Sequence, residues 1–567
     1  MQDPPDLPAT DIGRPHRHRN VPTCDPSAPA DIEALLADLP RRRDLLIEYL
    51  HRIQDRFGCL SSRHLQALAE LTGLPQAEVI EIARFTRHFD IVAEGTEAPP
   101  PLTIRVCSSL SCSLAGADAL FSHLSEWADP ARVRVLRVPC LGRCAEAPAA
   151  FVGKRAVTKA TPEAVVATVE GGDFAPALPA FVVGLQMYRE AGGYGLLEAC
   201  RAGKLPVGEL IAILAEAGLR GLGGAGTPVS EKWAAVLRHP GPRLVTVNAN
   251  EGEPGAFKDR HYLLRDPHRM LEGALIAAWA IEAERIVLYL SDDYPDAQAI
   301  LSREITLLAE ADLSGPTPIE LRRGAGRYLC GEETAMLESI EGKRGLPRRR
   351  PPDITERGLF GRPTLVHNIE TLWWLRDIVE RGADWFAGLG KPGHTGLRSY
   401  SVSGRVARPG IKVAPAGITL AELIEKHCGG MAPGHQLAAF LPGGASGGIF
   451  PAAFADRPLD FGTFEPDGGS IGVHAIIVLS DKDDVPAAAL TLLRFLRDES
   501  CGQCPACRTG TETLVALFGA GNADADAITA LAKAIDEGSL CGLGPAAAKL
   551  ACGLLRNFPQ NPTSEGT

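Results

Sequence analysis

The sequence predicts an α/β protein of several domains, with a helical segment near each end of the chain. Its 567 residues are several times the size of an ordinary domain, which holds about 150 residues. Short β-rich runs alternate with helix-length segments through the middle of the chain, as is typical of α/β domains. Nearer the ends, apolar residues recur at helical spacing instead. A hydrophobic share of 45% and a charged share of 22% favour a globular chain over a disordered or fibrous one.

The first two predicted segments are a tail and a helical bundle. Residues 1–33 contain Pro, Asp, Arg and His but few apolar side chains, so we expect a tail that becomes ordered only against a partner. Residues 34–95 are expected to form a small helical bundle, because apolar residues fall at helical spacing between Asp44 and Phe85.

Two α/β domains are expected next. Within residues 96–175, β-rich runs at 102–106 and 133–138 are separated by a helical stretch at 115–127. Within residues 176–392, predicted strands and helices alternate after a Pro-containing linker, which is typical of a larger α/β domain.

The C-terminal part is predicted to hold one β domain and one helical bundle. Residues 393–484 contain β segments separated by Gly and Pro clusters, and residues 485–558 have helical spacing. Residues 559–567 are expected to form a second tail. The sequence contains no internal repeat.

Charge and hydropathy exclude two classes of partner. The net charge of −11 argues against nucleic acid, because phosphate binding needs a basic surface. The apolar runs are shorter than the ~20 residues that a membrane span needs, so we expect no membrane association. The first residues carry Arg and His without an apolar stretch behind them, so no export signal can be recognised and a cytoplasmic location is expected.

The cysteines indicate metal or redox chemistry. Fourteen of them in a chain expected to stay in the cytoplasm should be reduced, so clustered ones favour metal binding over disulfides. Cys501, Cys504 and Cys507 form a C-x2-C-x2-C run, and Cys541 supplies a fourth thiol after an intervening helix. This arrangement favours a [4Fe–4S] cluster. Zinc is the alternative, although zinc sites more often contain two C-x2-C pairs or His.

A second group of four cysteines lies in two loops that follow predicted strands. Cys107 and Cys112 form C-x4-C, and Cys140 and Cys144 form C-x3-C. Four thiolates from two loops suit a [2Fe–2S] cluster, with a zinc site or a redox disulfide pair as alternatives. The isolated cysteines are expected to be mostly small core residues: Cys24, Cys59, Cys200, Cys330, Cys428 and Cys552.

Three glycine-rich loops lie in the larger α/β domain. The first runs from Gly221 to Gly226, with Lys232 shortly after it, and its backbone N–H groups could approach a phosphate. It departs from the dinucleotide pattern G-x-G-x-x-G, so a tight structural turn is the alternative. The other two loops, residues 248–260 and 324–333, set Gly beside paired carboxylates.

Exposed carboxylates are usually only solvated, but three such loops in one domain favour a flavin and nucleotide pocket. Iron–sulfur clusters transfer single electrons and nicotinamide transfers a hydride, and a flavin can exchange both. The combination predicts a converter between two-electron and one-electron transfer.

Together these motifs resemble the NADH-oxidising module of respiratory complex I and its soluble relatives, over about residues 40–558. The helical bundle and the four-cysteine domain resemble the small 24-kDa-type thioredoxin-like subunit. The rest resembles the 51-kDa-type flavoprotein subunit, with a Rossmann-like FMN domain, a β-grasp (SLBB-like) domain and a helical bundle carrying the [4Fe–4S] cluster. The resemblance implies four cofactors or substrates: FMN, NAD(H), one [2Fe–2S] cluster and one [4Fe–4S] cluster.

The fusion of both parts in one chain resembles the β subunit of soluble NAD-dependent formate dehydrogenases. Residues 396–404 and 459–463 also look more like this branch. The resemblance implies a diaphorase subunit that passes electrons from a molybdenum or tungsten bis-pterin subunit, itself carrying further iron–sulfur clusters, through clusters and FMN to NAD+. It also implies a hetero-oligomer, with a dimer of heterodimers as one arrangement.

Three other functions stay open. The chain also resembles the diaphorase subunit of NAD-reducing [NiFe] hydrogenases. An electron-transfer scaffold with impaired NAD(H) turnover and a zinc-stabilised interaction protein are the remaining alternatives.

Carried over to this sequence, the resemblance implies roles for residues of the three loops. The FMN phosphate would be held by Gly221, Gly223, Gly224, Gly226 and Lys232. The ribityl chain or ring would be approached by Asn248, Glu251 and Asn368. The flavin and NAD(H) would be surrounded by Glu253, Tyr328, Glu332 and Glu333, of which Glu253 and Glu333 are the catalytic candidates. The cofactor-binding set is completed by Asn250, Gly331, His367 and Thr371. Hydride would pass between nicotinamide and flavin without a protein nucleophile, so these residues position and tune.

Four positions depart from the family pattern. Thr227 replaces a Phe that stacks on the nucleotide, and Asn250 replaces an acidic residue. Asp353 ends an Arg-Pro-Pro-Asp run where the family has Lys-Pro-Pro-Phe, and His367 replaces the first residue of an Asn-Asn pair. Loss of an aromatic stack costs on the order of 1 kcal/mol, so the changes predict weaker NAD(H) binding or an altered nucleotide preference.

Overall fold

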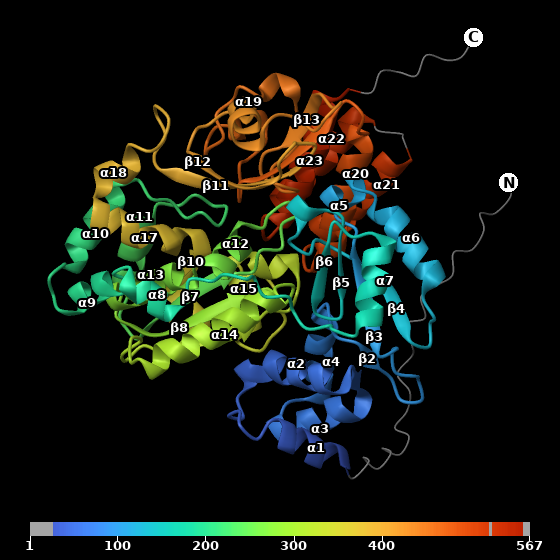
Figure 1. Ribbon diagram of the computed structural model, residues 1–567, viewed down its shortest axis with the longest axis horizontal. Coiled ribbons are helices and arrows are strands. Elements are labelled where there is room, and N and C mark those ends of the chain that lie inside the picture. Colours follow the sequence, from blue (N-terminus) through green and yellow to red (C-terminus); the bar gives the residue numbers. More distant parts are fainter. Residues whose placement is uncertain (1–26, 521–523, 560–567) are drawn as a thin grey trace.

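The computed structural model describes residues 27–520 and 524–559 (Figure 1). Most of the predicted N-terminal tail, and the C-terminal tail from residue 560, lie outside the described residues. Helix α1 (Ser27–Leu35) occupies the last part of the predicted N-terminal tail, so the extension of that tail to residue 33 is wrong. Ile32 and Leu36 are buried in the core of the adjoining bundle, and this tertiary packing stabilises a helix that composition alone does not indicate.

The N-terminal bundle lies at the bottom of Figure 1. Its further helices are α2 (Leu46–Phe57), α3 (Ser62–Thr72) and α4 (Gln76–Phe85). The short strands β1 (Leu60–Ser61) and β2 (Ile91–Val92) pair in parallel beside them. Gly58 and Gly73 end α2 and α3 in the left-handed conformation, and the Ser61 side chain accepts the His64 N–H at the start of α3.

The first α/β domain has a four-stranded mixed sheet in the order β4-β3-β5-β6. The strands are β3 (Leu102–Cys107), β4 (Val133–Val138), β5 (Ala149–Val152) and β6 (Arg155–Thr158). The helices are α5 (Leu110–Leu114), α6 (Ala117–Trp127) and α7 (Pro162–Gly171). The helix predicted at residues 115–127 is α6, which begins at Ala117 because Gly116 before it adopts a left-handed conformation with φ +91°. The short helix α5 was not predicted.

The larger α/β domain is built on a parallel four-stranded sheet in the order β10-β7-β8-β9. The strands are β7 (Arg243–Ala249), β8 (Ala283–Leu290), β9 (Ile319–Arg323) and β10 (Thr364–Asn368). The helices are α8 (Leu185–Glu190), α9 (Gly195–Arg201), α10 (Val207–Glu216), α11 (Val229–Leu237), α12 (Lys258–Arg265), α13 (Pro267–Ala280), α14 (Pro295–Glu310), α15 (Glu333–Ile340), α16 (Ile354–Arg357), α17 (Ile369–Arg381) and α18 (Ala383–Ala387). Asn248 and Asn368 are partners in the β7–β10 ladder, so both lie at the carboxyl edge of the sheet, where such sheets bind ligands.

The C-terminal third consists of a mixed sheet followed by a helical bundle. The sheet order is β12-β11-β15-β13-β14. Its elements are β11 (Leu397–Gly404), β12 (Gly410–Pro415), α19 (Leu420–Glu422), β13 (Leu437–Leu441), β14 (Phe450–Pro451) and β15 (Ala475–Ser480). The bundle is formed by α20 (Val485–Glu499), α21 (Pro505–Gly519), α22 (Ala525–Gly538) and α23 (Leu543–Asn557). Within the described parts of the chain, no helix has the length and apolar character that a bilayer crossing requires.

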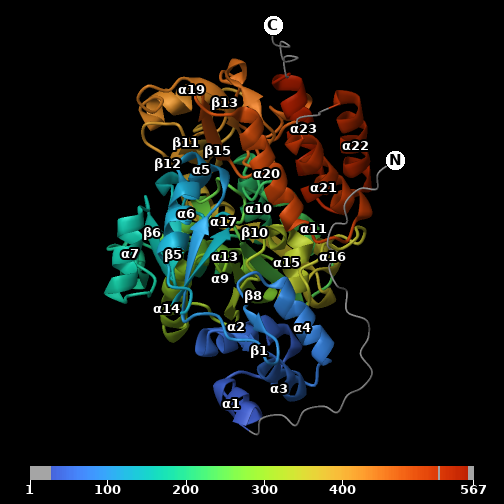
Figure 2. The same ribbon diagram turned by 90° about the vertical axis from the view of Figure 1, so that its right-hand side faces the viewer.

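The smaller domains pack along one side of the larger α/β domain. Figure 2 shows the N-terminal bundle below, the α20–α23 bundle above and the β3–β6 sheet beside them. Leu110 of α5 and Leu329 of the larger domain belong to the same buried core as α20 and α23. This shared core brings both cysteine groups next to the larger domain.

Candidate functional site

A cavity of about 480 Å³ opens at the carboxyl ends of β7 and β10. Most of the sequence-predicted cofactor residues lie in its wall: Gly221, Gly223, Gly224, Lys232, Asn248, Asn250, Glu251, Glu253, Tyr328, Gly331, Glu332, Glu333, His367 and Asn368. Ser446 and Val473 of the β domain and Cys541 of the C-terminal bundle complete the enclosure. Three separate parts of the chain therefore form one site.

Two of the predicted cofactor residues lie behind the wall. The Thr371 hydroxyl accepts the Leu222 N–H at 2.8 Å and so holds the glycine loop against α17. Gly226 has φ +68°, and a Cβ atom there would lie 2.7 Å from the Phe461 ring. Gly226 and Thr371 thus support the glycine loop, and their contact with the cofactor stays a prediction.

The glycine loop between α10 and α11 lines the cavity with backbone and, apart from Thr227 and Lys232 beyond it, only the small side chain of Ala225. Gly221 donates its N–H to the Thr227 carbonyl at 2.8 Å, which closes the loop. Gly224 has φ +119°, a conformation that favours glycine. Lys232 Nζ donates to Glu333 Oε1 at 2.8 Å and to the Val366 carbonyl at 2.9 Å. An ammonium beside exposed backbone N–H groups suits a phosphate, so this wall fits the phosphate end of FMN.

Glu251 is held by donors from three directions. Its carboxylate accepts the N–H groups of Asp259 and Arg260 at 3.1 and 3.3 Å, and the Tyr294 hydroxyl at 3.0 Å. Burial, and then the negative charge of Asp259, raise the pKa of Glu251 to about 8. Glu251 therefore takes up a proton more readily than an exposed carboxylate does.

Lys258 is a buried cation that the sequence patterns did not indicate. Its Nζ lies 2.8 Å from Asp259 Oδ1 and 3.2 Å from Glu370 Oε2, and it donates to Asn368 Oδ1 at 3.0 Å. Burial lowers the pKa of Lys258, but Asp259 and Glu370 outweigh burial and raise it above its ordinary value. The available signal was a lysine at the start of a helix, directly after a glycine-rich strand-end loop.

Glu253 lies under a loop from the β domain. It is 6% exposed, and its Oε1 accepts the Ser446 N–H at 2.9 Å. Burial raises the pKa of Glu253 to about 7, while the Tyr328 hydroxyl and Ser446 act in the opposite direction. The one sequence signal for Ser446 is the Gly-rich run at residues 442–448, which indicates a turn and nothing about Glu253.

Three of the four departing positions, Thr227, Asn250 and His367, line the cavity, whereas Asp353 does not. Thr227 and Arg350 line the cavity, and Arg350 Nη2 lies 3.2 Å from Glu332 Oε1. Trp233 Nε1 donates to His367 Nε2 at 2.7 Å. Burial, followed by the charge of Lys232, lowers the pKa of His367 well below its usual value, so its imidazole is neutral.

The first cysteine group is buried beside the cavity. Cys140 Sγ and Cys144 Sγ are 3.3 Å apart, and the Cys107 thiol lies within hydrogen-bonding reach of Cys112 and Cys140. The Gly142 N–H donates to Cys140 Sγ at 3.5 Å. An all-thiol donor set with backbone N–H groups fits an iron–sulfur cluster.

The second cysteine group borders both the cavity and the surface. Cys501, Cys504 and Cys507 lie at the start of α21, and Cys541 lies just before α23. The Leu540 N–H donates to Cys504 Sγ at 3.2 Å. Across the described ranges, no group of three or more His, Cys, Asp or Glu side chains has the arrangement of a single-ion site.

Four family models match successive parts of the chain. They are the thioredoxin-like [2Fe–2S] ferredoxin (residues 32–172), the Nuo51 FMN-binding domain (214–377), the SLBB domain (399–450) and the NADH-ubiquinone oxidoreductase-F iron–sulfur binding region (487–564). An F-type subunit of NADH-quinone oxidoreductase from Rhizobium meliloti (strain 1021) is 38% identical over 392 residues, which is 66% of this chain and 92% of the relative.

The chain belongs to the family of F-type NADH-quinone oxidoreductase subunits. The corresponding protein of Rhodobacter capsulatus is likewise 38% identical, over 60% of this chain and 83% of its own length. The crystal structure of an NAD+-reducing [NiFe]-hydrogenase in the air-oxidized state has a chain with a TM-score of 0.79 and 30% identity. The match covers 92% of this chain and 94% of that one.

This family member has an FMN-binding domain, a thioredoxin-like [2Fe–2S] domain and a [4Fe–4S] region, and NAD(H) is the family's substrate. The predicted cofactors are thereby confirmed, as is the resemblance to the NADH-oxidising module. The formate dehydrogenase branch stays a prediction.

Proposed function

We propose that this chain is the diaphorase β subunit of a soluble NAD-dependent formate dehydrogenase. It would pass electrons from a molybdenum or tungsten partner subunit to NAD+ in the cytoplasm. When bound, FMN exchanges a hydride with NAD(H) and single electrons with iron–sulfur clusters. The observation that carries the diaphorase part is that Cys541, a thiol of the C-terminal group, lines the same cavity as the glycine loop and Glu253.

The residues of the cavity wall bind and orient, and none acts as a nucleophile. The glycine loop offers backbone N–H groups, and Lys232 can exchange its Glu333 partner for a phosphate. Glu253 and Tyr328 line the same cavity and would border the nicotinamide. The roof residues Ser446 and Val473 help to exclude water, which strengthens electrostatic interactions inside the cavity.

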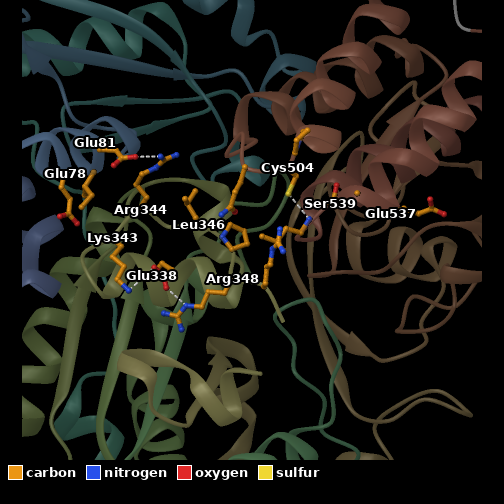
Figure 3. A pocket seen from close by; sticks show the side chains of 17 residues that line it. Glu78, Glu81, Glu338, Lys343, Arg344, Leu346, Arg348, Cys504, Glu537 and Ser539 are labelled. Carbon is orange, nitrogen blue, oxygen red and sulfur yellow. Dashed lines mark hydrogen bonds and ion pairs between the residues drawn. The ribbon is translucent and has the colours of Figure 1, made fainter. Parts of the chain in front are cut away.

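The second cysteine group also supports an entry point for electrons from a partner. Cys504 lines a second cavity of about 920 Å³ on the outside of the molecule (Figure 3). This outer cavity lies between α4, the segment 343–349 and the start of α21. Its rim carries charges of both signs, including the Arg344–Glu81 and Lys343–Glu338 ion pairs. A partner subunit docked there would come close to the [4Fe–4S] ligands.

Purification of the native complex tests the identity of the partner. We expect a copurifying large subunit with a pterin and molybdenum or tungsten, and formate-dependent reduction of NAD+. A nickel-containing large subunit with hydrogen-dependent NAD+ reduction would instead establish the hydrogenase alternative.

The hydrogenase alternative has its own support, because the match to an NAD+-reducing [NiFe]-hydrogenase chain extends over 92% of this chain. The scaffold alternative rests on Thr227 and Asp353, which replace aromatic residues of the family pattern. Bleaching of the bound flavin by NADH would exclude the scaffold.

A further inference from the structure

Tyr294 lies between the first cysteine group and the cavity, immediately before α14. It is 1% exposed, and its hydroxyl donates towards Glu251 Oε2 at 3.0 Å and lies 3.3 Å from the Glu251 carbonyl oxygen. The same hydroxyl end of the phenol lies against Gly142. A Cβ atom at Gly142 would lie 2.5 Å from the Tyr294 hydroxyl oxygen and 2.6 Å from Cε1.

Gly142 is the turn of the Cys140–Cys144 loop. Its N–H donates to Cys140 Sγ at 3.5 Å, and its φ of +66° is one that favours glycine. Hydrogen bonds to cluster sulfurs tune the reduction potential. Tyr294 therefore contacts a residue whose N–H group directly affects the cysteine site.

Arg260 provides a second link between the same two places. Its backbone N–H donates to Glu251 Oε2 at 3.3 Å, while its side-chain Nε donates to the Gly142 carbonyl at 3.2 Å. Arg260 bonds both Glu251 and Gly142, while Tyr294 bonds Glu251 and packs against Gly142. These two groups therefore have little freedom to move independently. The packing around them is close, as Leu141 is 2% and Arg143 4% exposed.

We propose that Tyr294 is a positioning residue that joins the [2Fe–2S] site to the flavin site, fixing the Glu251 carboxylate on the cavity wall and the Gly142 turn beside Cys140. The inference rests on the proposed placement of the [2Fe–2S] cluster at Cys107, Cys112, Cys140 and Cys144. Tyr294 takes no part in electron transfer itself. It sets the surroundings of both redox sites through one hydroxyl.

Tyr294→Phe removes that hydroxyl and keeps the ring. The Glu251 carboxylate loses a donor, which favours its protonated form, so the midpoint potential of bound FMN should rise. The Gly142 turn loses a contact, which weakens its N–H bond to Cys140, so the potential of the [2Fe–2S] centre should fall and its electron paramagnetic resonance spectrum should change.

Tyr289→Phe is the matched control. Tyr289 is also 1% exposed, and its hydroxyl pairs with Ser339 and the Ala325 N–H, neither of which lines the cavity or belongs to a cysteine group. Potentiometric titrations of the full, cofactor-loaded chain should show both potentials displaced in Tyr294→Phe and neither in Tyr289→Phe. Unchanged potentials in Tyr294→Phe, or a change at one site alone, would overturn the bridging role. Absence of a [2Fe–2S] signal from the unmodified chain would overturn the cluster placement instead, before any variant is compared.

Discussion

Glu253 makes the free energy of unfolding of the chain depend on pH. Its carboxyl titrates at an ordinary pKa of 4.5 in the unfolded chain, whereas burial raises the pKa to about 7 in the folded one. Between these two values the folded state binds more protons than the unfolded state, so the free energy of unfolding falls as pH rises. Above the folded-state pKa of about 7, the whole stabilising contribution of the protonated Glu253 has been lost. The difference corresponds to about 3 kcal/mol, at 1.36 kcal/mol for each pKa unit.

Glu253→Gln should remove this pH dependence. The Gln side chain keeps an acceptor for the Ser446 N–H, so the variant should match the parent chain near pH 5 and exceed its stability near pH 8 by up to about 3 kcal/mol. Urea unfolding of the FMN-free chain at both pH values, followed by circular dichroism, measures the difference between the two proteins. An equal pH slope in parent and variant would refute the raised pKa of Glu253 in the folded chain.

Three further predictions concern the cofactor sites. Gly226→Ala forces a Cβ atom against the Phe461 ring at a φ of +68°. We expect this to destabilise the folded loop by about 1–3 kcal/mol and to lower the FMN content of the purified chain. Full FMN occupancy would contradict this. Lys232→Met should weaken FMN binding to the apoprotein by about 10-fold or more, because a charged hydrogen bond to the phosphate is lost. Binding of riboflavin, which has no phosphate, should be unchanged. Equal losses of affinity for both ligands in a fluorescence titration would count against a phosphate contact. Cys504→Ser should reduce iron from about six atoms to about two while the [2Fe–2S] resonance persists; iron that stays near six would show that Cys504 is not a ligand.

Local patterns were sufficient to predict much of the framework. β4 (Val133–Val138) has the predicted bounds, because a short run with three valines is ended by Pro139. The glycine loop was recognised from its composition alone. A Cβ atom on Gly223 would lie 3.0 Å from Asn368 Cβ, and this close approach explains why position 223 is glycine.

The parts that were missed depend on contacts between distant segments. Ser446 donates to Glu253 across 193 positions, and no local pattern indicates which turn of a β domain will close another domain's cavity. Helix α1 was missed because its burial depends on the neighbouring helices rather than on its own composition. Lys258 was overlooked because a lysine beside Asp259 ordinarily belongs on the surface, and only the tertiary structure shows that it is fully buried.

The most direct test of the account is an anaerobic titration of the cofactor-loaded chain with NADH, recorded by visible absorption after iron and flavin analysis. We predict about six iron atoms and one FMN for each chain, and bleaching of the flavin band by NADH. The same iron and FMN content with an unchanged spectrum would contradict a working diaphorase and would leave a scaffold with an altered nucleotide pocket.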